Sequence, residues 1–394
     1  MSDLHKNGPT PSGYRGTVAA PSRDFTAPTV QFLTPEGELR PTPEAEGYLP
    51  LVEALPDAAL EQFYRDMVVS RRVDVTGANL QRQGQLALWV PSHGQEAAQV
   101  GSARAARPQD HVFPSYREHV VGMIRGLDPV AILKLLRGAT LGGWDPAENG
   151  NFHLYTLVLA SQTLHATGYA MGLQFDGATA TGDPEADAAV LVYYGDGSTS
   201  QGDANEALVF ASSYNTPQVF FVQNNQWAIS VPVSRQSRSP LSLRGGGFGM
   251  PGIRIDGNDV LASYAVTRQA LEEARAGEGP SFIEAVTYRM GAHTTADDPT
   301  KYRTDDEVAY WTARDPITRF RAWLEGRGAS AGFFAGVDEE AADIAADVRT
   351  RALEITAPPR SDIFAHVYSE PHPLVEAQAA WLEEYENSFE GGRA

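Results

Sequence analysis

One stretch of the sequence combines residue types that could do chemistry. The segment "VLVYYGDGSTSQGD" (190–203) is an apolar run that ends abruptly in Gly195, Asp196 and Gly197. Such a run is typical of a buried strand, and ligands of open parallel sheets bind beyond the carboxyl ends of the strands. Glycines let the backbone turn sharply, and the N–H groups of such a turn suit a phosphate. We therefore expect an anion site at this strand end.

The carboxylate in this turn indicates a cation. Asp196 would repel a phosphate held by the neighbouring glycines unless a cation lies between them, and Mg²⁺ fits because it binds protein, phosphate and water oxygens together. The next expected strand ends in "VQNNQWAIS", which places Asn225 29 positions after Asp196 (225 − 196 = 29). We predict that Asp196 and Asn225 meet at one edge of a sheet and bind Mg²⁺ there.

Alternating strand and helix patterns must position these residues. Apolar runs predict strands over 188–197, 217–225 and 281–289. Helical spacing predicts helices over 56–80, 128–137, 202–215 and 260–276, and another from Ser92, with Ser92 as its cap and Gln95 in the capping-box position. The segment 244–257 is expected to be a glycine-rich loop. Fully apolar strands that alternate with helices predict an α/β fold, a parallel sheet with helices on both faces.

The rest of the chain divides into three expected regions. Residues 1–50 are rich in Pro, Gly, Ser and Thr and predict an extended N-terminal arm, either a floppy tail or a strap lying on another subunit. Residues 51–330 form the expected phosphate-binding α/β domain. Residues 331–394 form an expected helical extension, with an acidic amphipathic stretch at 338–354.

Composition excludes several classes of function. The 394 residues carry a net charge of −19, which argues against nucleic-acid partners and anionic membrane surfaces. The chain has no cysteine, so thiol catalysis, iron–sulfur clusters and disulfides are excluded. We expect no membrane association, because no stretch approaches the roughly 20 apolar residues of a span. We expect a cytoplasmic location, because the N-terminus lacks the apolar core of an export signal.

Several segments resemble a known family. The "GDG" turn, followed 29 residues after its Asp by the second Asn of "NN", resembles the thiamine-diphosphate motif. The chain from about 55 to 390 further resembles the alpha subunits of the two-chain 2-oxo acid dehydrogenases, and the branched-chain and pyruvate types resemble it most. The matching segments are "QRQGQLALWVPSHGQEAAQVGSA" (81–103), "VFPSYREH" (112–119), "QNNQWAISVP" (223–232), "GIRIDGNDVLASY" (252–264) and "YRMGAHTTADDPTKYR" (288–303).

The resemblance implies roles for particular residues. Asp196, Asn225 and the carbonyl of Trp227 would bind Mg²⁺, and the Trp227 side chain would belong to the core. The residues that would contact thiamine diphosphate are Tyr116, Arg117, Ser161, Gly197, Ser198, Gln223 and His293. Gln223 stands where branched-chain relatives often have an arginine, so Mg²⁺ and Arg117 would carry more of the neutralisation of the diphosphate.

His293 is the catalytic residue that the resemblance implies. It would reach the diphosphate and the mouth of the active site from the loop "GAHTTADD". A network of five residues would order this loop: Arg289, Asp297, Asp298, Tyr302 and Arg303.

The same resemblance implies partners. Its members decarboxylate a 2-oxo acid with Mg²⁺ and thiamine diphosphate, and pass the acyl group to a lipoyl group on an acyltransferase. The 101 residues after His293 (394 − 293) are few for a second α/β domain, so a beta subunit would complete the site in an α₂β₂ tetramer. That subunit would supply the glutamate that activates the aminopyrimidine.

Alternatives remain at two levels. Within the family, the substrate is expected to be a branched-chain 2-oxo acid of the 3-methyl-2-oxobutanoate type, with pyruvate or acetoin as alternatives. Outside it, a non-catalytic assembly subunit conflicts with the presence of Asp196, Asn225, Arg117 and His293. A dinucleotide enzyme conflicts with Ser200, which stands where the G-x-G-x-x-G fingerprint needs its third glycine.

Overall fold

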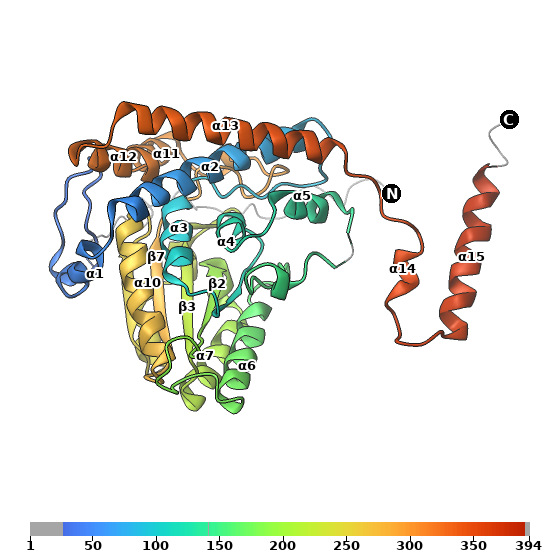
Figure 1. Cartoon of the computed structure of the whole chain (residues 1–394), viewed down its shortest axis with the longest axis horizontal. Coiled ribbons are helices and arrows are strands. Elements are labelled where there is room, and N and C mark those ends of the chain that lie inside the picture. Colours follow the sequence, from blue (N-terminus) through green and yellow to red (C-terminus); the bar gives the residue numbers. More distant parts are fainter. Residues whose placement is uncertain (1–26, 141, 391–394) are drawn as a thin grey trace, which may run out of the picture.

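The centre of the molecule is a parallel sheet. The computed structural model describes residues 27–140 and 142–390. In the order β1-β2-β3-β7-β6, five parallel strands form the sheet (Figure 1). Their bounds are β1 His111–Phe113, β2 Val190–Gly195, β3 Gln218–Asn224, β6 Gly252–Asp256 and β7 Ser281–Val286. The strands β2 and β3 are neighbours, with Gly195 opposite Gln223, so their carboxyl ends lie at the same edge, as the sequence predicts.

Helices cover both faces of the sheet, which confirms the predicted α/β fold. Val192 and Tyr194 of β2 pack in one core cluster with α6 (Ser161–Phe175) and α7 (Gly202–Tyr214). The alternate residues Leu191 and Tyr193 belong to a second cluster with α3 (Glu96–Ala105) and α10 (Val260–Arg275). Successive strand side chains point to opposite faces, so an apolar strand needs both layers. Outside α3, α2 (Asp57–Arg82) and α13 (Ala331–Leu353) lie side by side (Figure 1).

The remaining elements are short or peripheral. The helices are η1 Pro43–Tyr48, α1 Leu49–Glu53, α4 His119–Ile124, α5 Pro129–Arg137, η2 Pro146–Glu148, η3 Gly197–Ser200, α8 Val233–Gln236, α9 Leu243–Gly247, η4 Pro299–Lys301, α11 Asp305–Thr312, α12 Pro316–Gly326, α14 Asp362–Ala365 and α15 Pro373–Glu390. The strands β4 (Trp227–Ala228) and β5 (Val231–Pro232) form a small antiparallel pair. No helix in the described ranges is long and apolar enough to cross a membrane.

Three local predictions were wrong or incomplete. The segment 244–257, expected as a loop, contains α9 and the edge strand β6, which pairs with β7. The strand β1 was not expected, because its three residues are too few to establish a periodicity. Ser92 does not cap α3, which begins at Glu96; instead its N–H donates to Asp74.

The described part of the N-terminal arm packs on its own chain. Val30 bridges to Ile255 of β6, and both Phe32 and Leu33 are fully buried. The backbone N–H groups of Phe32 and Leu33 donate to the Asp259 carboxylate at 2.6 and 2.8 Å. Residues 27–50 are therefore not a floppy tail, because they pack on the body of their own chain. Residues 1–26 of the predicted arm lie outside the described residues.

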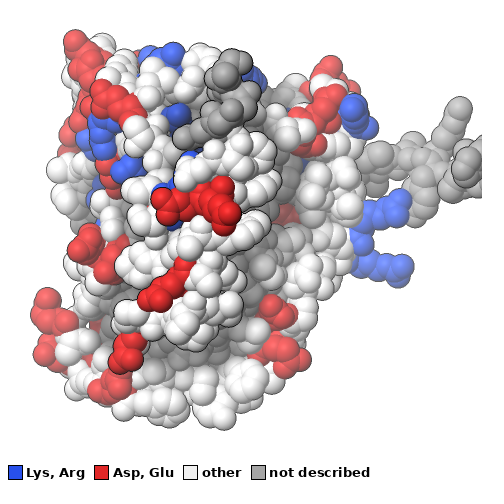
Figure 2. Space-filling model, turned by 90° about the vertical axis from the view of Figure 1, so that its right-hand side faces the viewer, with Lys and Arg blue, Asp and Glu red and all other residues white. Residues whose placement is uncertain are grey.

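The C-terminal region is helical, as expected. The helix α13 buries Ala341, Ala345, Val348 and Ala352, which is the apolar face predicted within 338–354. The last helix, α15, stands apart from the body of the molecule (Figure 1). Acidic side chains are scattered among many uncharged ones on the side of the molecule shown in Figure 2.

Candidate active site

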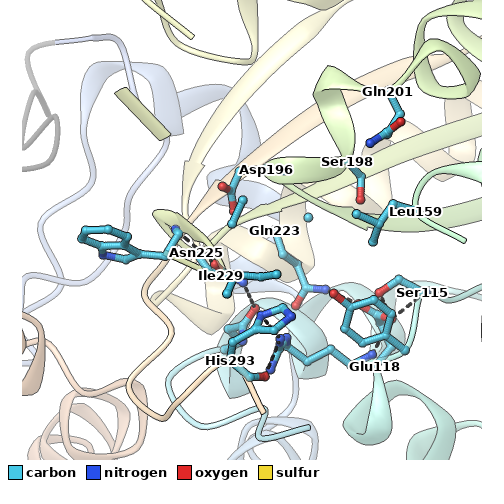
Figure 3. A pocket seen from close by; sticks show the side chains of 17 residues that line it. Ser115, Glu118, Leu159, Asp196, Ser198, Gln201, Gln223, Asn225, Ile229 and His293 are labelled. Carbon is cyan, nitrogen blue, oxygen red and sulfur yellow. Dashed lines mark hydrogen bonds between the residues drawn. The ribbon is translucent and has the colours of Figure 1, made fainter. Parts of the chain in front are cut away.

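A cavity opens at the edge of the sheet where β2 and β3 end. Its volume is about 270 Å³. Its lining comes from the two strand ends, the 115–118 segment, the start of α3 and the loop that carries His293 (Figure 3). The lining residues are Gln95, Ser115, Tyr116, Arg117, Glu118, Leu159, Gly195, Asp196, Gly197, Ser198, Gln201, Gln223, Asn225, Trp227, Ala228, Ile229 and His293.

The structure brings together all but one of the predicted site residues. The exception is Ser161, whose hydroxyl donates to the carbonyl of Val158 at 3.0 Å and which does not line the cavity. Leu159, which lies two residues before the start of α6, lines the cavity instead. The Trp227 side chain is buried and its indole N–H donates to Glu307 at 2.6 Å, so it belongs to the core as predicted.

Three oxygens converge at the strand ends. Asn225 Oδ1 lies 3.1 Å from the Trp227 carbonyl oxygen and 3.3 Å from Asp196 Oδ1. Acceptor oxygens at such separations repel one another unless a cation lies between them. Neighbouring ligands of an octahedral Mg²⁺ with bonds of about 2.1 Å are about 3.0 Å apart, so this set fits that ion. No group of three or more His, Cys, Asp or Glu residues in the described ranges could hold a metal. The oxygen set described here is not a group of that kind, because it has one carboxylate and two neutral oxygens.

The Asp196 carboxylate is held by a neutral side chain. The side chain is buried, and Gln236 of α8 donates to its Oδ2 at 3.0 Å. Burial raises the pKa of the Asp196 carboxyl to about 6, although the Gln236 hydrogen bond opposes this shift. A buried carboxylate of this kind is a strong ligand for a cation, because binding removes the desolvation cost.

Arg117 supplies the fixed positive charge of the cavity. It is buried, its Nη1 donates to the Pro91 carbonyl, and its Nη2 donates to the His293 carbonyl at 3.1 Å. Glu118 fixes the backbone around it, accepting from Ser115 N, Ser115 Oγ and Arg117 N. Among the lining residues Arg117 is the only Lys or Arg, so a bound anion has one guanidinium to pair with.

Gln223 is engaged within the protein. Its Nε2 donates to Glu118 at 2.6 Å, and its Oε1 accepts from Gln99 at 2.9 Å. One N–H of its amide therefore stays available to the cavity. This supports the expectation that Gln223 offers a hydrogen bond but no charge.

Two guanidinium groups fix the protonation of His293. Arg117 Nη2 lies 3.2 Å and Arg289 Nη1 lies 3.1 Å from His293 Nδ1. Because guanidinium groups only donate, Nδ1 must accept and the ring proton must lie on Nε2. Burial and the two arginines lower the pKa of His293 to about 3. His293 is thus a neutral hydrogen-bond donor through Nε2.

We predict that His293 does not titrate between pH 5 and 8. Its folded-state pKa lies well below this window, so the ring stays neutral throughout. The ring ¹⁵N shifts of His293, assigned by comparison with the His293→Gln variant, should be constant over the window and should show protonated Nε2. A midpoint near pH 6, or a proton on Nδ1, would contradict the assignment.

Arg289 joins the predicted loop network to the oxygen cluster. It donates to the Trp227 carbonyl at 3.0 Å, the Ile229 carbonyl at 2.8 Å and the Tyr302 hydroxyl at 2.9 Å. Tyr302 in turn donates to Asp297, which also accepts from His293 N at 2.8 Å.

The other two members of the predicted network differ from each other. Arg303 joins the network through the backbone, because it donates to the carbonyls of Arg289 and Met290. Asp298 bonds to Thr300 instead and caps η4. Asp298 therefore stands outside the hydrogen bonds that link Arg289, Tyr302 and Asp297.

The glycine turn is close-packed on one side only. A Cβ on Gly197 would lie 2.7 Å from Ala228 Cβ, whereas a Cβ on Gly195 would meet no atom within 4 Å. Gly197 and Ser198 begin η3, so their N–H groups have no partner within that helix. The turn thus offers N–H donors to the cavity while it packs against the strand that carries the Trp227 carbonyl.

The two glycines give a matched pair of variants. Gly197→Ala should lower the free energy of unfolding by about 1–3 kcal/mol, because the methyl group must displace Ala228 and β4. Gly195→Ala should change the free energy of unfolding by less than about 0.5 kcal/mol. Urea unfolding of the two variants tests this, and equal destabilisation would contradict the packing argument.

Three further residues of the site escaped prediction as ligand or support residues. Gln236 contacts Asp196 from α8, Glu118 supports Arg117 and Gln223, and Gln95 contacts Asn225. Only Gln95 and Glu118 lie inside segments that carried the family resemblance. Nothing in the local pattern around Gln236 distinguishes it from a surface glutamine.

Fold and site together define a class: an α/β domain with converging oxygens and a buried arginine in a cavity at the ends of two adjacent parallel strands. Residues 64–351 match the family described as "Dehydrogenase E1 component". The chain belongs to this family, which implies thiamine diphosphate as the cofactor.

Individual relatives cover much of the chain. It is 44% identical, over 90% of its length and 93% of the relative's, to "3-methyl-2-oxobutanoate dehydrogenase subunit alpha" of Mycobacterium tuberculosis. It is 40% identical, over 71% of its length and 73% of the relative's, to "Pyruvate dehydrogenase E1 component subunit alpha" of Staphylococcus aureus. A Staphylococcus epidermidis protein of that name matches equally.

Proposed function

We propose that this chain is the alpha subunit of a branched-chain 2-oxo acid dehydrogenase that acts on 3-methyl-2-oxobutanoate. The observation that carries the proposal is the convergence of three oxygens in the cavity that Arg117 also lines. The Mycobacterium tuberculosis relative, matched over nine-tenths of the chain, supports this substrate class.

The residues present fit Mg²⁺ and a diphosphate. Asp196, Asn225 and the Trp227 carbonyl would hold the cation, as one carboxylate and two neutral oxygens suit a hard ion that also binds phosphate. Arg117 and the N–H groups of Gly197 and Ser198 would hold the diphosphate oxygens. When bound, thiamine diphosphate supplies the electron sink for decarboxylation. The contact of Ser161 with thiamine diphosphate remains only a prediction, because Ser161 does not line the cavity.

His293 and its loop serve the reacting end of the cavity. The neutral ring can donate from Nε2 to an acceptor on a bound cofactor or substrate, and its lowered pKa makes it a poor proton acceptor, so it is a weak base. Arg289, Tyr302 and Asp297 hold the loop and keep Nδ1 occupied. The chain's own residues thus bind and orient.

A partner must supply the proton-transfer carboxylate. Of the two carboxylates that line the cavity, Asp196 faces the cation site and Glu118 already accepts four hydrogen bonds, from Ser115 twice, Arg117 and Gln223. We therefore propose a beta subunit that completes the site in an α₂β₂ tetramer. The family resemblance further leads us to propose a lipoyl-bearing acyltransferase that takes the acyl group. The cytoplasmic location remains a prediction.

The test is decarboxylation assayed with an artificial electron acceptor. The chain is purified alone and with its beta partner, and 3-methyl-2-oxobutanoate and pyruvate are compared with Mg²⁺ and thiamine diphosphate added or withheld. Turnover that needs partner, cation and cofactor, with higher kcat/KM for the branched acid, is the expected result. Full turnover by the chain alone would contradict the proposal.

Pyruvate is the second candidate substrate. The Staphylococcus aureus relative named for pyruvate matches over 71% of this chain. A preference for pyruvate in the same assay would keep the cofactor site and replace the substrate.

A further inference from the structure

The amide of Asn225 has two possible orientations with different partners. As it stands, its Nδ2 donates to Gln95 Oε1 at 3.2 Å, and its Oδ1 accepts weakly from Trp227 N at 3.4 Å while facing two oxygens. Rotated by half a turn, its Nδ2 would donate to the Trp227 carbonyl at 3.1 Å and to Asp196 Oδ1 at 3.3 Å. Only the first orientation presents an oxygen to a cation.

The buried amide of Gln95 has a partner for its oxygen but none for its nitrogen. It lies immediately before α3, it is completely buried, and it lines the cavity. Its Oε1 is occupied by Asn225, but its Nε2 has no hydrogen-bond partner. A buried donor without a partner is costly. If Gln95 also rotated by half a turn, its amide nitrogen would take the place of Oε1 and donate to Asn225 Oδ1.

Two mutually consistent states follow. In one, the Gln95 oxygen accepts from Asn225, Asn225 Oδ1 faces the cation, and Gln95 Nε2 is left for a bound ligand. In the other, both amides are turned, Asn225 donates to Asp196 and Trp227, and no oxygen of Asn225 faces the cation position. A mixed state would set two oxygens or two N–H groups against each other.

We propose, on the basis of the function proposed above, that Gln95 is a positioning residue of the cation site. Its oxygen holds the Asn225 amide in the cation-binding orientation, and the two amides turn together when the cation leaves. Gln95 acts through Asn225 and is not itself a ligand.

The test is Mn²⁺ binding by the complex of this chain with its beta partner, at saturating thiamine diphosphate, followed by the electron paramagnetic resonance signal of free Mn²⁺. Gln95→Met keeps the length of the side chain but cannot accept, so its Mn²⁺ affinity should fall about tenfold or more. Gln95→Glu can only accept and should bind Mn²⁺ within about twofold of wild type or more tightly. Gln162→Met is the control, because Gln162 is buried and donates to the Tyr193 carbonyl away from the cavity.

The outcomes separate the inference from the function on which it rests. Equal affinity of wild type and Gln95→Met overturns the positioning role. An equal loss of Mn²⁺ affinity in Gln95→Met and Gln95→Glu also overturns it, because a hydrogen-bond acceptor at this position would then make no difference. If wild type binds no Mn²⁺, the cation site fails and the proposed function fails with it.

Discussion

Asp196→Asn should abolish turnover while it stabilises the metal-free protein. The carboxylate is buried next to two neutral oxygens, and burial raises its pKa from an ordinary value near 3.8 to about 6. The charged form is therefore disfavoured in the folded state, so above pH 6 its presence lowers stability. A shift of about two units corresponds to about 3 kcal/mol. Replacing the charge with an amide should recover about 1–3 kcal/mol of the free energy of unfolding at pH 8.

The same change should remove the cation. A neutral amide cannot balance Mg²⁺, so we expect kcat/KM to fall by more than about 100-fold, beyond the effect of residues that only support a ligand. Urea unfolding in EDTA and decarboxylation with the beta partner measure the two effects. The matched control is Asp203→Asn, because Asp203 lies in the first turn of α7 and does not line the cavity. Destabilisation in EDTA, or turnover within tenfold of wild type, would contradict the assignment of Asp196.

Arg117→Gln should weaken thiamine diphosphate binding by about 100-fold. Arg117 is the only Lys or Arg among the lining residues, and Gln223 adds no charge. A charge-assisted hydrogen bond contributes about 1.5–3 kcal/mol, and 1.4 kcal/mol is a factor of ten. Arg117→Lys keeps the charge but cannot form bidentate hydrogen bonds, so the affinity for thiamine diphosphate should fall about tenfold. The concentration of thiamine diphosphate that gives half-maximal turnover measures both variants.

A control must separate charge from folding, because Arg117 also donates to backbone carbonyls. Arg125→Gln provides it: Arg125 donates to four carbonyls, those of Gly150, Arg107, Pro108 and Asp110, and does not line the cavity. Its replacement should lower the melting temperature and leave the affinity for thiamine diphosphate unchanged. If Arg125→Gln lowers the affinity for thiamine diphosphate as much as Arg117→Gln does, a general loss of structural stability explains both results.

The long elements of the fold could be predicted because each has a clear period. The apolar strands β2, β3 and β7 and the helices α2, α7 and α10 lie within one to three residues of the predicted ends. The strand β6 was missed because glycines dominate the sequence around it, and its pairing with β7 is a tertiary contact. The packing of Phe32 and Leu33 against the body was missed for the same reason, since their N–H groups donate to a carboxylate more than 220 positions away.

The site could be predicted where residues act through their own type. Asp196 and Asn225 follow from strand ends and oxygen chemistry, and Arg117 and His293 from the resemblance. Supporting residues could not be identified in the same way, because Gln95 and Gln236 matter through the atoms they face. The neutral state of His293 likewise requires two arginines from different segments.

The adjacency of β2 and β3 makes the geometry of the site independent of the length of chain between its residues. Asp196 and Asn225 are kept together by the pairing of two strands, whereas the 29 positions between them measure only the route through α7 and back. The chemistry requires the pairing and is indifferent to the length of the route. A residue inserted at Asn215, the exposed residue that follows α7, would lengthen the interval and leave the oxygens in place, whereas a single slip of register between the strands would separate them. The alignment of the two strands, and not the length of chain between them, therefore determines the geometry of this centre.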